Sequence, residues 1–477
     1  MNSLMEIIEL TDKIAIPLFL MTLAVVVAIR ISRWFFEPSS SKMAKDIIDQ
    51  LKSNKLTNLK KGNTDVHGVI FGLTKSNQKL YSPEDKESHI GCFSATGTGK
   101  TSSILIPSLQ SIKNANAFVI DISGDIHKNC NIENKLIYEP DDPDTPKYNI
   151  FAPIDALPPE ERPEALSMLA YLIMPSSEAV SANANAKYFF ENGRRILQAS
   201  LIAFYDSMDF TEIAEKVVYS NHYELFRAID ATNNTLAKAY INGFEAVSEQ
   251  NTSGCKQVCN EALELYCTNQ KIRNSIGRPD NGIAVEPTAL ETNRIFVIVT
   301  EDKLSLYAPL LNIITSQMMQ YISTRRVDKD SKTIFLFLDE FPALGISSSI
   351  ILDAVRRFRK RKARVVLLMQ NIVDLDLLYG KDCSRAILSN LHYKILLGGL
   401  NDPESQLYFS QLIGKRSFTN QSVSYSNNSK TITKSEVQQY AIEPAMLDRQ
   451  GASTVLLICS DVENGYIKLK KNYYFKQ

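Results

Sequence analysis

A short loop of small residues constrains the fold of this chain more than any other feature. Residues 90–107 read IGCFSATGTGKTSSILIP, an apolar segment followed by glycines and threonines and then by Lys100 and Thr101. Apart from Ser94, which stands where a glycine is usual, this is the pattern of a phosphate-binding loop that joins a strand to a helix. The backbone N–H groups of such a loop point at phosphates, and its glycines permit close approach. The pattern predicts an α/β fold in which the nucleotide is bound by Ser94, Ala95, Thr96, Gly97, Thr98, Gly99, Lys100, Thr101 and Ser102.

A second segment supplies the acidic residues that such a site requires. Residues 334–338 are an unbroken apolar run, typical of a strand buried on both faces of a parallel sheet. Asp339 and Glu340 follow it, at the strand end where ligands bind in open α/β sheets. We expect Thr101 and Asp339 to hold Mg²⁺, and Glu340 to orient or deprotonate the water that attacks ATP. A core strand that ends in a solvated acidic turn is the alternative interpretation.

Two further features follow that strand. Seven of the nine residues 356–364 are basic. Such a segment suits an arginine finger that reaches a neighbouring subunit's γ-phosphate, or a contact with a nucleic-acid backbone. A charged face balanced by acidic residues elsewhere is the alternative. Gln370 comes directly after the apolar run 365–369. It suits a sensor of the γ-phosphate or of the attacking water, and a simple polar residue at a strand end is the other interpretation.

The N-terminal region has the pattern of a membrane anchor. Residues 14–29 are apolar and uncharged; acidic residues precede them, and Arg30 and Arg33 follow. Because a cleaved signal peptide has basic residues before its apolar run, this order predicts an uncleaved anchor with its C-terminal side in the cytoplasm. The polar, lysine-rich segment that follows suits a juxtamembrane linker, or an ordinary solvated helix and loop. The formal net charge of +0 neither supports nor excludes a nucleic-acid partner.

A helical region interrupts the strand pattern. Between residues 156 and 281, apolar residues recur at spacings of three and four, and no strong strand signal appears. We expect an all-helical insertion that serves substrate contact or partner docking, or that only packs against the rest. The predicted organisation is a membrane anchor (1–36), a juxtamembrane linker (37–65), the first part of a nucleotide-binding domain (66–157), an all-α insertion (158–285) and the second part of the nucleotide-binding domain (286–477).

Together these segments resemble the coupling proteins of type IV secretion systems, the conjugative DNA-transfer ATPases related to RecA-like hexameric translocases. The resemblance runs from about residue 85 onward. The segments that carry it are SATGTGKT at 94–101, DISGD at 121–125, YFFENGRRIL at 188–197, FLFLDEFPALG at 335–345, LLMQNIVDLDLLYG at 367–380 and ILSNLHYKILLGG at 387–399.

The resemblance implies a RecA-like P-loop NTPase core with an inserted all-α domain and one N-terminal transmembrane helix. It implies a single-pass protein of the inner (cytoplasmic) membrane, with its ATPase domain in the cytoplasm and ATP and Mg²⁺ as cofactors. Such a protein assembles as a homo-hexamer, recruits a relaxase or another secreted substrate, and drives DNA, single-stranded in our expectation, into a type IV secretion channel. By the resemblance Glu340 is the catalytic acid, Gln370 the sensor, and Arg359 the arginine finger, favoured over Arg361.

The chain departs from the family pattern in three places, and two other functions stay open. Ser94 replaces the first glycine of the loop, Ser123 stands where members often have lysine, and one apolar span is found where many members have two. A duplex DNA translocase of the chromosome-segregation kind is one alternative function. A substrate-docking receptor with weak ATPase activity is the other, although the intact loop and acidic pair argue against it. Residues 416–440, rich in Ser, Thr and Asn, suit either a strand pair or a mobile loop.

Overall fold

The computed structural model describes residues 59–176, 180, 182–279, 282, 284–426 and 429–476. These residues belong to one compact unit, Asn58–Gln477. The predicted membrane anchor and most of the predicted linker lie outside the described residues. In the part of the chain that is described, no helix combines the length and the hydropathy that a membrane crossing requires.

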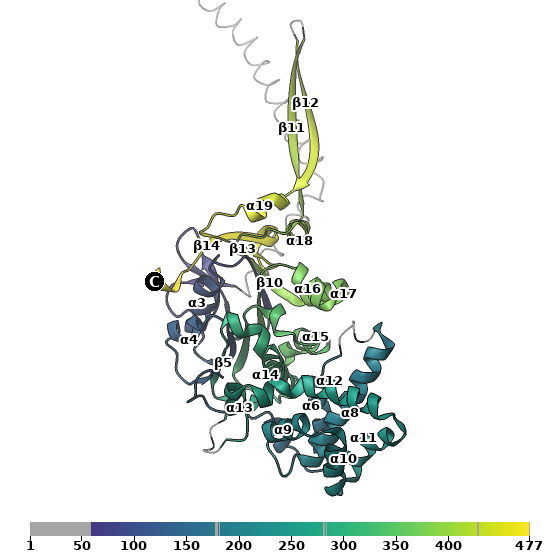
Figure 1. Ribbon diagram of the computed structural model, residues 1–477. Helices are drawn as coiled ribbons and strands as arrows, with labels where there is room; N and C mark the ends of the chain where they lie inside the picture. The colour runs from purple at the N-terminus through teal and green to yellow at the C-terminus, as the bar shows by residue number, and fades with distance from the viewer. Residues whose placement is uncertain are drawn as a thin grey trace, which may run out of the picture. The chain divides into compact units, whose positions relative to one another are not determined.

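A mixed sheet of 12 strands lies at the centre of the unit (Figure 1). The seven strands from β10 to β6 run parallel to one another, whereas the pairs from β1 through β13 to β10 are antiparallel. In spatial order the strands are β1 (Lys60–Gly62), β3 (Lys79–Pro83), β2 (Gly68–Leu73), β14 (Tyr466–Lys470), β13 (Thr454–Ile458), β10 (Leu391–Leu396), β4 (His89–Phe93), β9 (Ala363–Met369), β8 (Thr333–Leu338), β5 (Ala115–Asp121), β7 (Arg294–Ile298) and β6 (Lys135–Tyr138).

The parallel strands are apolar because both faces of the sheet are covered. In β8, Phe335 and Phe337 pack into one hydrophobic cluster, and Leu336 and Leu338 pack into the cluster on the opposite face. Successive side chains of a strand point to opposite faces, so a strand covered on both sides needs apolar residues at every position. The expected apolar run before Asp339 is therefore a doubly buried strand.

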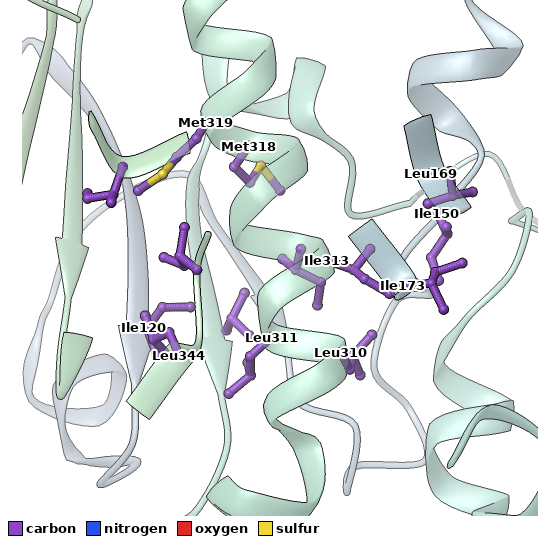
Figure 2. Close-up of a cluster of buried hydrophobic side chains, with 14 of the residues drawn as sticks. Ile120, Ile150, Leu169, Ile173, Leu310, Leu311, Ile313, Met318, Met319 and Leu344 are labelled. Atoms are coloured by element: carbon purple, nitrogen blue, oxygen red, sulfur yellow. The ribbon is translucent and has the colours of Figure 1, made fainter. Parts of the chain in front are cut away.

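Helix α14 (Leu304–Thr324) joins the sheet to the helical part of the chain. Figure 2 shows Leu311 and Met319 on the side of the helix that faces Ile120 and Leu344. On the other side of α14, leucine and isoleucine side chains face a second group of apolar residues from the helical part: Ile150, Leu169 and Ile173. All of these residues belong to one continuous buried cluster, which fixes the helical part against the nucleotide-binding core.

The chain between β6 and β7 is helical, and its described residues contribute no strand to either sheet. Two of the helices begin with a capping box, in which Glu212 and Glu224 accept from the backbone N–H of Asp209 and Asn221. The expected helical region is thus present, while the domain boundaries at 158 and 285 stay a prediction. The helices are α5 (Ala152–Asp155), α6 (Arg162–Ile173), α8 (Ala184–Phe204), α9 (Phe210–Tyr219), α10 (His222–Ala231), α11 (Thr235–Ile241), η2 (Asn242–Ala246), α12 (Glu249–Thr268) and α13 (Gln270–Ser275).

Residues 415–440 form a strand pair, one of the two possibilities left open by the sequence. Strands β11 (Lys415–Ser426) and β12 (Ser429–Tyr440) pair antiparallel as a separate two-stranded sheet. The other helices are η1 (Thr101–Leu105), α3 (Ile106–Ser111), α4 (Asp125–Asn129), η3 (Pro287–Glu291), η4 (Glu301–Lys303), η5 (Phe341–Leu344), α15 (Ser348–Arg357), η6 (Phe358–Arg361), α16 (Val373–Tyr379), α17 (Lys381–Asn390), α18 (Pro403–Ile413), α19 (Pro444–Asp448), η7 (Glu463–Gly465) and η8 (Tyr474–Lys476).

Candidate nucleotide site

Three adjacent strands bring the predicted site residues to one edge of the sheet. The loop 94–100 follows β4, Asp339 and Glu340 follow β8, and Gln370 follows β9, which lies between the other two. Since all three strands are parallel, their carboxyl ends meet at the same edge. The expected α/β architecture, with the phosphate-binding loop between a strand and a helix, is confirmed.

The loop has the backbone that a phosphate cradle requires. Gly97 and Gly99 have φ values of 74° and 93°, in the left-handed region that favours glycine. A Cβ at Gly97 would find no atom within 4 Å, so the space in front of this residue is open. The helix that follows starts as a π-helix, η1, a form often found at functional sites.

Ser94 has a role inside the loop that a glycine cannot have. The Thr98 hydroxyl donates to Ser94 Oγ at 2.7 Å and lies 2.8 Å from the carbonyl oxygen of Ala95. The backbone N–H of Ser94 donates to the Met369 carbonyl at 3.2 Å, which ties the loop to β9. The serine that departs from the usual pattern therefore adds a side-chain hydrogen bond within the loop, between its Oγ and the Thr98 hydroxyl.

Lys100 and Glu340 form an ion pair in the centre of the site. Lys100 Nζ lies 3.2 Å from Glu340 Oε1 and 3.2 Å from the carbonyl oxygen of Ser94. Gln370 Nε2 lies 3.5 Å from both carboxylate oxygens of Glu340. Glu340 itself has a left-handed backbone, with φ 44°, which is strained for a residue that has a side chain and is typical of functional sites. The structure thus brings together Lys100, predicted to bind the phosphates, with Glu340 and Gln370, predicted as the catalytic acid and the sensor.

Asp339 is buried beside this pair, with 7% of its surface exposed. Burial, first, and the neighbouring Glu340 carboxylate, second, raise the pKa of Asp339, and Lys100 opposes them; the net pKa is about 6. A divalent cation would relieve this crowding of negative charge, and the Thr101 side chain lines the same cleft. The residues present therefore fit the predicted Mg²⁺ site, with oxygen ligands of the kind that Mg²⁺ prefers.

The cleft has a volume of about 360 Å³ and includes residues that the sequence analysis did not single out. Asp125 lines it from the start of α4, Glu301 from the start of η4 and Tyr474 from η8. Asp125 belongs to the DISGD segment, so the family resemblance was one available signal for it. Nothing in the local sequence marks Glu301 or Tyr474, because their neighbours in space come from distant parts of the chain.

Arg359 lies away from the cleft of its own chain. It is an exposed residue of η6, which precedes β9, whereas Gln370 follows that strand. A seven-residue strand separates the two ends by on the order of 20 Å. Arg359 can therefore act only on another subunit's site, as the finger hypothesis requires, and that role stays a prediction.

Three residues of the basic segment 356–364 donate hydrogen bonds to backbone carbonyls within the fold. Arg361 Nη1 donates to the Arg325 carbonyl at 2.8 Å, and Lys362 Nζ donates to the Asp328 carbonyl at 2.7 Å. Arg364 is fully buried and donates to the backbone carbonyls of Ser88 and Pro83. Desolvation lowers its pKa to about 10. These three residues fasten loops at the amino end of the sheet, and they are not part of an open nucleic-acid surface.

A family profile matches the chain over all of the described residues. The family is described as type IV secretory system conjugative DNA transfer, and the match covers residues 40–477. The chain belongs to this family. The resemblance that the motifs carried is confirmed.

Individual relatives agree with this assignment. The VirD4 protein of Agrobacterium fabrum is 24% identical over 386 residues, which cover 76% of this chain and 55% of VirD4. The chain thus spans about half the length of the curated relatives it matches. The unbound conjugative coupling protein TrwBdeltaN70 superposes with a TM-score of 0.66 at 16% identity, covering 89% of this chain and 90% of the TrwBdeltaN70 chain. TrwB in complex with ADP and Mg²⁺ superposes with a TM-score of 0.63 at 17% identity, covering 84% and 89%. At these identities the two structures establish the fold alone.

Proposed function

We propose that this chain is an ATP-hydrolysing coupling protein that drives DNA into a type IV secretion channel. The observation that carries the proposal is the convergence of Lys100, Glu340 and Gln370 within 3.5 Å at the end of a phosphate-binding loop. A chain that only docks substrates has no need for a carboxylate set between an ammonium and an amide group. Membership of the conjugative DNA-transfer family supports DNA as the substrate that is moved.

The proposed chemistry is the transfer of a phosphoryl group from ATP to water. Lys100 would neutralise charge on the β- and γ-phosphates, while the loop N–H groups hold them. Mg²⁺, held by Thr101 and Asp339, would neutralise developing charge when bound. Glu340 would accept the proton of the attacking water as its oxygen bonds to the γ-phosphorus and the bond to ADP breaks. Gln370, at the end of β9, would sense the presence of the γ-phosphate.

The rest of the proposal concerns assembly and partners. The core is proposed to be of the RecA-like type, supported by the single strand β9 that separates the loop strand β4 from the acidic strand β8. The position of Arg359, remote from its own cleft, supports a homo-hexameric ring in which it serves a neighbour. The proposal includes a single-pass anchor in the inner membrane, a relaxase or other secreted substrate, single-stranded DNA and the components of the channel.

The proposal is tested by ATP hydrolysis measured with and without single-stranded DNA. We expect the wild-type chain to hydrolyse ATP faster when DNA is present. Glu340→Gln should lower the rate at least 100-fold, because the amide cannot accept the proton, while ATP binding is retained. Glu249→Gln, an exposed change at the start of α12, is the matched control and should leave the rate unchanged.

Two results would contradict the proposal. Hydrolysis by Glu340→Gln at the wild-type rate would remove this residue from the chemistry. ATP binding by the wild-type chain without turnover, with or without DNA, would favour the docking receptor.

A further inference from the structure

The segment that follows β14 returns to the phosphate-binding loop and is fastened to it. Lys471 Nζ donates to the carbonyl oxygen of Thr98 at 2.6 Å, and the Lys471 backbone N–H donates to the Ser453 carbonyl at 2.8 Å. Lys471 is 7% exposed and Asn472 is 4% exposed. A buried ammonium group bonded to a loop carbonyl fixes this segment against the loop. The start of the segment 471–476 is therefore held beside the phosphate-binding loop.

Three aromatic residues follow in this segment. The ring of Tyr473 packs on the loop, since its Cε1 atom lies 3.3 Å from where a Cβ on Gly99 would be. Tyr474 lines the nucleotide cleft. Phe475 stacks with Tyr473 at a centroid distance of 5.1 Å and meets Tyr474 edge to face at 5.3 Å. In Figure 1 the C-terminal end of the chain lies beside α3, which continues from η1.

The direction in which a nucleotide must lie brings its base toward this segment. The γ-phosphate belongs at Lys100 and Glu340, and the loop N–H groups near the start of the helix hold the α- and β-phosphates. The ribose and base therefore leave the loop on the side of η1. Helix η8, which contains Tyr474, contacts η1.

The chemistry of the cleft also favours Tyr474. Among the described residues that line the cleft, Tyr474 is the only aromatic one. The other side chains there include those assigned to phosphate and Mg²⁺ and the carboxylates of Asp125 and Glu301. A planar base stacks on an aromatic face, with a gain that does not depend on which base it is.

We propose that Tyr474 is the base-stacking residue of the nucleotide site, positioned by the bond between Lys471 and the loop. The proposal rests on the proposed nucleotide-binding function and adds the recognition of the base. It implies selection for a planar base over none, with little discrimination between adenine and guanine, because stacking reads no hydrogen-bonding pattern.

The test compares ATP with inorganic tripolyphosphate, which carries the phosphates without a base. Dissociation constants are measured for the wild-type 477-residue chain, for Tyr474→Ala and for Tyr474→Phe, all in Mg²⁺. Tyr474→Ala should weaken the binding of ATP and of GTP by about tenfold, and leave the binding of tripolyphosphate unchanged. Tyr474→Phe, which keeps the aromatic face, should bind both nucleotides as the wild type does. Tyr223→Ala, an exposed tyrosine of α10, is the control.

Each other outcome has a definite meaning. Unchanged ATP binding by Tyr474→Ala would overturn the proposal. An equal loss of ATP and tripolyphosphate would also overturn it, since Tyr474 would then support the loop and not the base. A wild-type chain that bound neither ligand would overturn the proposed function itself, so the tripolyphosphate measurement separates the two failures.

Discussion

Replacing Asp339 by asparagine should stabilise the chain when neither metal nor nucleotide is bound. The pKa of Asp339 is raised from 3.8 to about 6 in the fold, mainly by burial. At 1.36 kcal/mol per pKa unit, this shift corresponds to about 3 kcal/mol. A raised pKa means that the folded chain binds the proton more tightly than the unfolded chain does. The ionised carboxylate therefore destabilises the fold, fully above about pH 6 and progressively less as the pH falls toward 3.8.

The measurement is urea denaturation with a chelator present, at pH 8 and at pH 4.5. We expect Asp339→Asn to raise the free energy of unfolding by about 3 kcal/mol at pH 8 and by about 1 kcal/mol at pH 4.5. Asparagine can keep the bond that Asp339 Oδ1 accepts from the Glu340 backbone N–H, 3.2 Å away. The exposed change Asp302→Asn serves as the control and should shift stability by no more than about 0.5 kcal/mol at either pH.

Two results would refute this reasoning. The first is an Asp339→Asn chain no more stable than the wild type at pH 8, which would mean that burial does not penalise the charge. The second is an equal gain at both pH values, which would assign the effect to packing. The same substitution should also abolish the Mg²⁺ dependence of nucleotide binding, so that stability and function change in opposite directions.

Three further predictions concern backbone, burial and thiol reactivity. Gly97→Ala should cost about 1 kcal/mol of stability and lower the affinity for ATP, measured by titration, at least tenfold. The control is Gly465→Ala, at a matching φ of 76° and also without a neighbour within 4 Å. It should cost the same stability and leave the affinity for ATP unchanged. Arg364→Lys should lower the free energy of unfolding in urea by about 2 kcal/mol, because one ammonium group cannot satisfy the separate buried acceptors that the guanidinium reaches; an unchanged urea midpoint would contradict this. Of the seven cysteines, only Cys383 is partly exposed, and burial raises the pKa of Cys92 to about 12, so a thiol reagent at pH 8 should find at most one reactive group before denaturation and seven after it.

The centre of the site could be predicted from sequence because its parts are local motifs at strand ends. The residue types and spacing in the loop 94–101 indicate phosphate binding, and Asp339 and Glu340 are recognisable as an acidic pair at a strand end. A parallel sheet brings such strand ends together. Gln370 was predictable for the same reason, since it ends an apolar run. What the sequence does not contain is the order of strands, which places β9 between β4 and β8 and so sets Gln370 beside Glu340.

Other residues could not be interpreted correctly from local sequence. A count of basic residues does not distinguish an arginine that faces solvent from one that faces buried carbonyls, and Arg364 is of the second kind. Tyr474 reaches the site because the chain passes through the antiparallel strands β13 and β14 and then returns to the loop. The acceptor role of Ser94 depends on the Thr98 rotamer, which no pattern of residue types records.

The ion pair between Lys100 and Glu340 has a consequence for the order of events at the site. An incoming polyphosphate brings its own negative charge to Lys100, so binding is an exchange of partners and the lysine is never left alone. The carboxylate that is released then has Gln370 Nε2 as its neighbour, 3.5 Å away. Before that exchange the Glu340 carboxylate is engaged by the Lys100 ammonium group, 3.2 Å away. In the proposed reaction, the binding of the polyphosphate thus releases Glu340 from the ion pair, so the carboxylate becomes available to the attacking water only once ATP is bound.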